Sequence, residues 1–290
     1  GSFLTHKFGD EKKVYEQPLC VYEVHLAPRR RKDGEFMKAN EIAPQLIQYM
    51  HEQGFTHVEF LPVYEHPLDD SWGYMGTGYY SVSARFGVPK DFMYLVDEMH
   101  KNGFGVIMDW VPGHICRDDF GLYMFDGSAL YDYSDPKIRD NEVWGTANLD
   151  LGKGLTQSFL YSNAMFWLKY FHVDGFRVDA VSNIIYYLGN PANGVNEGAC
   201  DFLRGLSRNL FAYDDRVLLM AEDSSAHDGV TRPVDMGGLG FNYKWNMGWM
   251  NDTLRYFKLD PIYRKYHHNL ITFGLVYGFS EQFILPLSHD

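Results

Sequence analysis

Ionisable residues stand at the ends of four apolar runs, and these are the positions in the sequence that could do chemistry. The four blocks are residues 109–114, 175–181, 219–223 and 285–290. If the apolar runs are neighbouring strands of one parallel sheet, their carboxyl ends meet at one edge. The carboxylates of Asp179, Glu222 and Asp290 would then share one rim. Such a cluster can divide into an ionised and a protonated group, which acid–base and nucleophilic catalysis require.

The spacing within two of these blocks predicts which side chains meet. Arg177 and Asp179 lie two positions apart, so they point to the same face of a strand. There the guanidinium would hold Asp179 ionised through charge-assisted hydrogen bonds. Glu222 and Asp223 are adjacent and would point to opposite faces, so their closeness in sequence does not predict mutual repulsion.

Seven apolar segments have strand character, and segments of helical period separate most of them. The predicted strands cover residues 19–26, 57–61, 105–110, 176–181, 217–221, 239–245 and 283–287. The predicted helices cover 40–53, 89–103, 156–171 and 199–211, with Asn40 and Thr156 as amino-terminal caps and Gly54 ending the first helix. This alternation predicts an α/β fold with parallel strands, either a (β/α) barrel or a doubly wound sheet. The sequence contains neither G-x-G-x-x-G nor a P-loop, so a nucleotide-binding open sheet loses its main support.

The composition narrows the classes of partner. The 290 residues carry a net charge of −12, which argues against nucleic acid and anionic membranes. Aromatic residues make up 17% of the chain, and such rings suit carbohydrate surfaces as well as a core. The three cysteines are odd in number and lack metal-ligand spacing, so they favour a reducing, cytoplasmic compartment. No run of about 18 apolar residues and no signal peptide is present, and Gly1 and Ser2 are typical of a cloning remnant on a deliberately cut chain.

The four blocks, in this order and on these strands, resemble the four signature regions of the α-amylase superfamily of glycoside hydrolases and transglycosylases. Asp-Trp-Val-Pro-Gly-His at 109–114, Ala-Glu-Asp-Ser-Ser at 221–225 and Leu-Ser-His-Asp at 287–290 are more narrowly similar to bacterial glycogen branching enzymes. Residues 69–74 and 232–241 share this likeness, which covers nearly the whole chain from Leu19 onward. The resemblance implies a (β/α)8 barrel of the TIM type.

The resemblance also implies roles for individual side chains. Asp179 matches the nucleophile, Glu222 the general acid/base and Asp290 the carboxylate that stabilises the transition state. A retaining mechanism of this kind places the first two carboxyl groups roughly 5 to 5.5 Å apart. The remaining matches concern substrate binding: His114 and His289 would hydrogen-bond sugar hydroxyls, Tyr74 would stack on the same sugar, and Asp109 and Arg177 would support the site.

The implied reaction is transfer of an α-1,4-glucan chain to a 6-hydroxyl, which makes an α-1,6 branch during glycogen synthesis. Nothing in the carboxylates themselves distinguishes this transfer from hydrolysis, because the choice of acceptor depends on the groove and on water exclusion. A hydrolase of the same superfamily is therefore one alternative. We expect no cofactor, and no metal site because the acids stand on separate strands rather than in a ligand cage.

The predicted organisation is a leader at 1–18 and a barrel at 19–290, with an irregular insert at about 115–155. The amino-terminal β-sandwich and the carboxyl-terminal β-domain of the family have no counterpart in the sequence, nor does an eighth strand. The barrel would therefore expose two sheet edges, which another chain or a rearranged segment would have to cover. Self-association through these edges, or a silent piece that only binds glucan, are the further alternatives.

Overall fold

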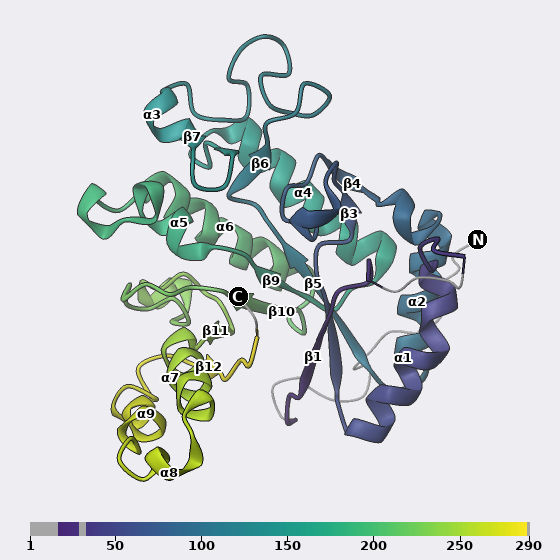
Figure 1. Ribbon diagram of the computed structural model, residues 1–290. Coiled ribbons are helices and arrows are strands. Elements are labelled where there is room, and N and C mark those ends of the chain that lie inside the picture. Colours follow the sequence, from purple (N-terminus) through teal and green to yellow (C-terminus); the bar gives the residue numbers. More distant parts are fainter. Residues whose placement is uncertain (1–16, 29–32, 289–290) are drawn as a thin grey trace.

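The computed structural model describes residues 17–28 and 33–288 (Figure 1). Its centre is a sheet of seven parallel strands, and each strand pairs with the next one along the chain. The strands are β1 (Val21–Val24), β2 (His57–Phe60), β5 (Gly105–Trp110), β9 (Gly175–Val178), β10 (Leu218–Ala221), β11 (Tyr243–Trp245) and β12 (Phe283–Ile284). A doubly wound sheet reverses its strand order at a switch point, whereas this order never reverses. The seven predicted strands are confirmed, and within the described residues they form the sheet of a (β/α) barrel.

The helices and the smaller sheets occupy the connections between these strands. The α-helices are α1 (Ala39–Gln53), α2 (Pro89–Lys101), α3 (Pro136–Arg139), α4 (Gly154–Phe171), α5 (Val181–Ile185), α6 (Glu197–Tyr213), α7 (Met247–Lys258), α8 (Pro261–Arg264) and α9 (Asn269–Thr272). Short 3-10 helices are η2 (Asp69–Ser71), η3 (Ala84–Phe86), η4 (Tyr187–Gly189), η5 (Pro191–Asn193), η6 (Val234–Met236) and η7 (Phe273–Val276). Strands β3 (Tyr64–Glu65) and β4 (Gly78–Val82) form one antiparallel pair.

The insert after β5 is more ordered than the sequence predicts. It holds β6 (His114–Cys116), β7 (Asp140–Asn141) and β8 (Thr146–Asn148), which form a three-stranded antiparallel sheet in the order β6-β8-β7. Figure 1 shows this insert, with α3, projecting beyond the main sheet. Strands of two or three residues leave too short an alternation to be read from a sequence.

Both predicted amino-terminal caps are wrong. Helix α1 begins at Ala39, and Asn40 lies inside its first turn; the Lys38 N–H donates to the Glu41 carboxylate at 2.8 Å instead. Helix α4 begins at Gly154, and the Thr156 hydroxyl donates to the Tyr131 carbonyl at 3.0 Å, which ties the helix to the insert. The predicted end of α1 is confirmed, because Gly54 adopts the left-handed conformation that glycine allows (φ 75°).

The sheet separates two apolar clusters. The large outer cluster lies between the strands and helices α1, α2, α4 and α6, and it takes alternate strand residues such as Val106, Phe176 and Leu219. The small inner cluster consists of Ile107, Leu218 and Met220, with Leu19, Val21, Tyr243 and Ile284 packed against it. Further along the strands the inner face turns from apolar to charged, so a packed apolar layer supports a polar rim, as in other parallel barrels.

Gly175 on β9 lies directly beside Leu218, its register partner on β10. A Cβ atom there would lie 2.2 Å from the Leu218 carbonyl oxygen, which is backbone and has little room to move. We therefore expect Gly175→Ala to lower the free energy of unfolding by about 1–3 kcal/mol. Gly154→Ala is the matched control, because no atom lies within 4 Å of its added methyl group. Urea unfolding of both variants checks this, and equal stability of the two would contradict it.

Candidate active site

Arg177 on β9 links the ends of two neighbouring strands. Its Nη1 atom lies 2.9 Å from Asp109 Oδ1 and 2.8 Å from Asp179 Oδ1. Asp109 is its register partner on β5, and both side chains are only 1% exposed. The Asp179 side chain is 14% exposed and therefore remains open to a ligand. The predicted pairing of Arg177 with Asp179 is present.

The backbone brings Asp179 and Glu222 to the same edge of the sheet. The Asp179 N–H donates to the Trp110 carbonyl at 2.9 Å, and the Glu222 N–H donates to the Val178 carbonyl at 3.0 Å. Ala180 then adopts a left-handed conformation (φ 51°, ψ 45°) and turns the chain into α5. In this turn the Ala180 N–H donates to Glu222 Oε2 at 2.6 Å. A non-glycine residue with positive φ is strained, and such strain is common at functional sites.

Asp223 turns away from this edge. Its carboxylate lies 3.1 Å from Lys244 Nζ and accepts from the Ser225 N–H at 2.9 Å, while the Glu222 side chain contacts the turn after β9. Adjacent strand residues therefore point to opposite sides, as expected. Asp223 is thus held in a buried ion pair with Lys244. Glu222 is therefore the acid of block 219–223 that faces the site.

Tyr74 and His114 complete the network around Asp109. The Tyr74 hydroxyl donates to Asp109 Oδ2 at 2.5 Å, and Arg177 Nη1 lies 3.4 Å from the same hydroxyl. His114 Nε2 lies 3.1 Å from the Tyr74 carbonyl oxygen, so this nitrogen carries the proton. The Trp144 ring of the insert lies 5.0 Å from the His114 ring, centre to centre. Four of the predicted site residues thus meet in one connected group with Asp179.

Burial sets the charge of these groups. It lowers the pKa of His114 to about 4, so the imidazole is neutral at pH 7. Burial also raises the pKa of Asp109, to about 7, although Arg177 and the Tyr74 hydroxyl act in the opposite direction. Burial works against the charge of Arg177 as well, but the Asp109 carboxylate and other anionic groups hold its pKa well above the ordinary value. The site therefore combines a fixed cation with a neutral histidine.

Three inward-facing residues of this group were not predicted. Glu23 on β1 and Glu59 on β2 are register partners, and the charge of Glu23 contributes to the raised pKa of Asp109. Trp245 on β11 places its ring 4.5 Å from the Arg177 guanidinium carbon. A lone acid inside an apolar strand is a signal that could have identified the two glutamates, because alternation places it opposite the outer core. His289 and Asp290 lie outside the described residues, so their predicted places are not tested.

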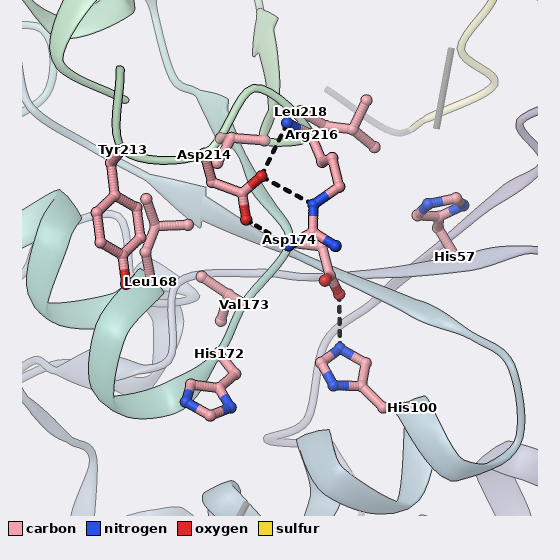
Figure 2. Close-up of a pocket in the computed structure, with 11 residues that line it drawn as sticks. His57, His100, Leu168, His172, Val173, Asp174, Tyr213, Asp214, Arg216 and Leu218 are labelled. Atoms are coloured by element: carbon pink, nitrogen blue, oxygen red, sulfur yellow. Dashed lines mark hydrogen bonds and ion pairs between the residues drawn. The ribbon is translucent and has the colours of Figure 1, made fainter. Parts of the chain in front are cut away.

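The opposite end of the sheet holds a separate polar cavity of about 70 Å³ (Figure 2). His100 Nε2 donates to the Asp174 carboxylate at 2.7 Å, and Asp174 also accepts from the Val106 N–H at 2.7 Å. His57, at the start of β2, lines the same cavity. These contacts join α2 to the amino-terminal ends of the strands, so this cavity is distant from the carboxylate rim and serves the fold.

Within residues 17–28 and 33–288, no group of three or more His, Cys, Asp and Glu side chains could hold a metal ion. No helix among them is both long and apolar enough to cross a membrane.

Comparisons with known proteins agree on one family. Residues 41–148 match the model of the alpha amylase catalytic domain. The 1,4-alpha-glucan branching enzyme of Bacillus caldolyticus is 58% identical over 280 residues, which cover 96% of this chain and 42% of that protein. The branching enzyme of Geobacillus stearothermophilus is 55% identical over 280 residues, covering 96% of this chain and 44% of that protein. The chain thus spans less than half the length of these curated relatives.

Solved structures show the same fold at lower identity. The alpha-amylase of Geobacillus thermoleovorans, complexed with acarbose, aligns with a TM-score of 0.62 at 19% identity, over 81% of this chain and 53% of that one. The trehalose-6-phosphate hydrolase of Bacillus licheniformis aligns with a TM-score of 0.66 at 19% identity, over 81% of this chain and 49% of that one. At this identity the likeness concerns the fold alone.

Removing the buried cation should be costly unless its partner is removed as well. We expect Arg177→Leu to lower the free energy of unfolding by about 3–5 kcal/mol, because Asp109 would remain buried without its cation. The double variant Arg177→Leu, Asp109→Leu should recover part of this loss. Urea unfolding of the wild type, Arg177→Leu, Asp109→Leu and the double variant measures both effects. If the free energy of unfolding of the double variant falls by the sum of the two single decreases, the ion pair does not couple the strands.

The buried His57 should make stability depend on pH. Burial lowers its pKa to about 4, whereas the unfolded chain has the ordinary value of 6.5, so the unfolded state binds more protons between these values. Its stabilising contribution is complete above pH 6.5 and is lost as the pH falls toward 4. We expect His57→Asn to remove up to about 3 kcal/mol of this pH dependence.

Urea unfolding at pH 7.5, 6 and 5 measures the slope for the wild type and for His57→Asn. The control is His267→Asn, which replaces an exposed histidine and should leave the slope unchanged. Equal slopes for wild type and His57→Asn would mean that His57 titrates alike in the folded and unfolded states.

Proposed function

We propose that this chain belongs to the α-amylase family and carries the catalytic residues of a 1,4-α-glucan branching enzyme. One observation carries the proposal: Arg177 binds Asp179 at 2.8 Å, and the turn that follows Asp179 is hydrogen-bonded to Glu222 at 2.6 Å. Two carboxylates in different environments thus stand at one sheet edge. The names of the relatives at 55–58% identity supply the reaction and the substrate.

In the first step Asp179 is the nucleophile. Glu222 gives its proton to the glycosidic oxygen as the bond to the anomeric carbon breaks, and Asp179 forms an ester with that carbon. The Arg177 guanidinium keeps Asp179 ionised before the attack. Asp290 is proposed to stabilise the positive charge that develops on the sugar ring. The donor chain then remains attached to the protein.

In the second step the 6-hydroxyl of another glucan chain attacks the same carbon. Glu222 accepts the hydroxyl proton, the ester bond breaks, and Asp179 returns as a carboxylate. The product carries an α-1,6 branch, and both partner chains are α-1,4-glucans such as glycogen or amylose. Water as the acceptor would make the protein a hydrolase, and this remains the alternative reaction.

The surrounding groups hold the sugar. The neutral imidazole of His114 would hydrogen-bond sugar hydroxyls from the Nδ1 side, since its Nε2–H is taken by the Tyr74 carbonyl. The Tyr74 ring would stack on the same sugar, and its hydroxyl is fixed by Asp109. His289 would supply a second hydrogen bond. A protein of this kind is expected to act in the cytoplasm, where glycogen is made.

We expect Asp179→Ala to abolish turnover on amylose without unfolding the chain, because it removes the atom that forms the ester. Iodine colour, reducing ends and α-1,6 signals in proton NMR follow the reaction. Asp201→Ala, at an exposed carboxylate on α6, is the control and should keep wild-type turnover. Turnover in Asp179→Ala would exclude it as the nucleophile.

The wild-type products distinguish the alternatives. New α-1,6 signals with few new reducing ends are expected of a branching enzyme. Reducing ends without branches would show hydrolysis, and glucan binding without any product would show that this chain alone is silent.

A further inference from the structure

Trp72 is an exposed aromatic residue at the carboxyl-terminal edge of the sheet. It directly follows the 3-10 helix η2, and 47% of its surface is exposed. Its ring lies 5.7 Å from the ring of His25, centre to centre, with 42° between the two planes. His25 comes directly after Val24, the last residue of β1, so it stands at the carboxyl end of that strand. Trp72 therefore lies at the same edge of the parallel sheet as the candidate active site.

The backbone of Trp72 is strained. It has φ 54° and ψ 17°, which lie in the left-handed region that bulky side chains rarely adopt. Asparagine or glycine enters this region more readily, so the turn by itself does not favour a tryptophan. Strain of this kind is common where a side chain has a function. The indole ring thus needs a reason that lies outside the turn.

The loop that carries Trp72 is held on both sides. Before it, the Arg85 guanidinium binds the Asp69 carboxylate, with Nε 2.5 Å from Oδ1. After it, Gly73 packs so closely against the end of β2 that a Cβ atom would lie 2.4 Å from the Pro62 carbonyl oxygen. An aromatic ring on a fixed loop loses little freedom when a ligand binds to it, which favours binding.

The same loop joins Trp72 to Tyr74. The Tyr74 N–H donates to the Ser71 carbonyl at 2.9 Å, which closes a turn around Trp72 and Gly73. The Cα atoms of residues 72 and 74 can be at most about 7 Å apart, because only two residues separate them. Any chain of sugar units that passes over Tyr74 is therefore within reach of the Trp72 ring.

We propose that Trp72 is a stacking platform for one glucose unit of the glucan chain, beside the unit that Tyr74 holds. This proposal rests on the proposed function, which supplies the α-1,4-glucan and the role of Tyr74. The faces of a glucose ring carry C–H groups and are apolar, whereas its hydroxyl groups stand around the rim. Stacking such a face on the exposed indole ring removes apolar surface of both from water. Trp72 thus contributes binding, while the carboxylates contribute the chemistry.

The first test measures the Kd of maltoheptaose, a linear α-1,4-glucan, by isothermal titration calorimetry. Trp72→Asn suits the left-handed backbone but removes the ring, so we expect the Kd to rise about fivefold to thirtyfold. Trp72→Phe keeps an aromatic ring and should raise the Kd less. Tyr94→Ala is the control, because it removes a similarly exposed aromatic side chain (46%) from α2 and should leave the Kd unchanged. An unchanged Kd in Trp72→Asn would overturn the platform.

Turnover on amylose separates this proposal from the proposed function. Trp72→Asn should raise KM by a similar factor and change kcat less than about threefold, because stacking holds the ground state and the transition state alike. Binding that depends on Trp72 in a chain without turnover would mean that the proposed function fails while the platform stands. A wild-type chain that does not bind maltoheptaose would overturn the platform, and its turnover would then decide the proposed function separately.

Urea unfolding distinguishes the platform from a purely structural role. Asparagine relieves the left-handed strain, so Trp72→Asn should leave the unfolding midpoint unchanged or raise it. A ring that served only to cover His25 would behave differently, because its removal would lower the midpoint and leave the Kd as it is. That result would overturn the platform.

Discussion

A guanidinium enclosed inside the sheet constrains everything around it. Arg177 is 1% exposed, so its charge has to be balanced by groups within the protein rather than by water. Asp109 and Asp179 each place a carboxyl oxygen within 3 Å of Arg177 Nη1, and the Trp245 ring covers one face of the guanidinium. Because these groups come from β5, β9 and β11, they can meet only if the strands keep their register. The ionised state proposed for Asp179 depends on this arrangement.

The same constraint separates the two ends of the sheet. At the carboxyl ends of the strands, Asp109, Asp179 and Glu222 lie around the buried Arg177 guanidinium. At the amino-terminal ends, His100 and Asp174 pair and the strands are tied to α2. A balanced pair stabilises the fold, whereas an excess of one charge can act on a substrate. The polar cavity in Figure 2 therefore lies at the amino-terminal ends of the strands, where the charged groups are paired and stabilise the fold.

The sequence predicted the seven strands, because apolar runs that alternate with segments of helical period are typical of βα units. It also predicted that Arg177 meets Asp179, because residues two positions apart on a strand share a face. It did not predict where the strands end. The predicted strand 176–181 includes Val181, but the left-handed turn at Ala180 places Val181 in α5, where its side chain is also buried. An acid inside an apolar strand can indicate that Glu23 faces inward, but not that its charge reaches Asp109 on β5. That requires knowledge of how the sheet curls, which no local pattern contains.

The two apolar clusters also imply an order of events when the chain folds. The outer cluster is built largely from each strand and the helices next to it, so its contacts can form between neighbouring segments as soon as they exist. The inner cluster draws on residues from Leu19 to Ile284, and contacts between distant positions form slowly. A ribosome releases the amino-terminal strands first. The inner face of β1 therefore has to remain without its final partners until nearly the last of these residues has been synthesised.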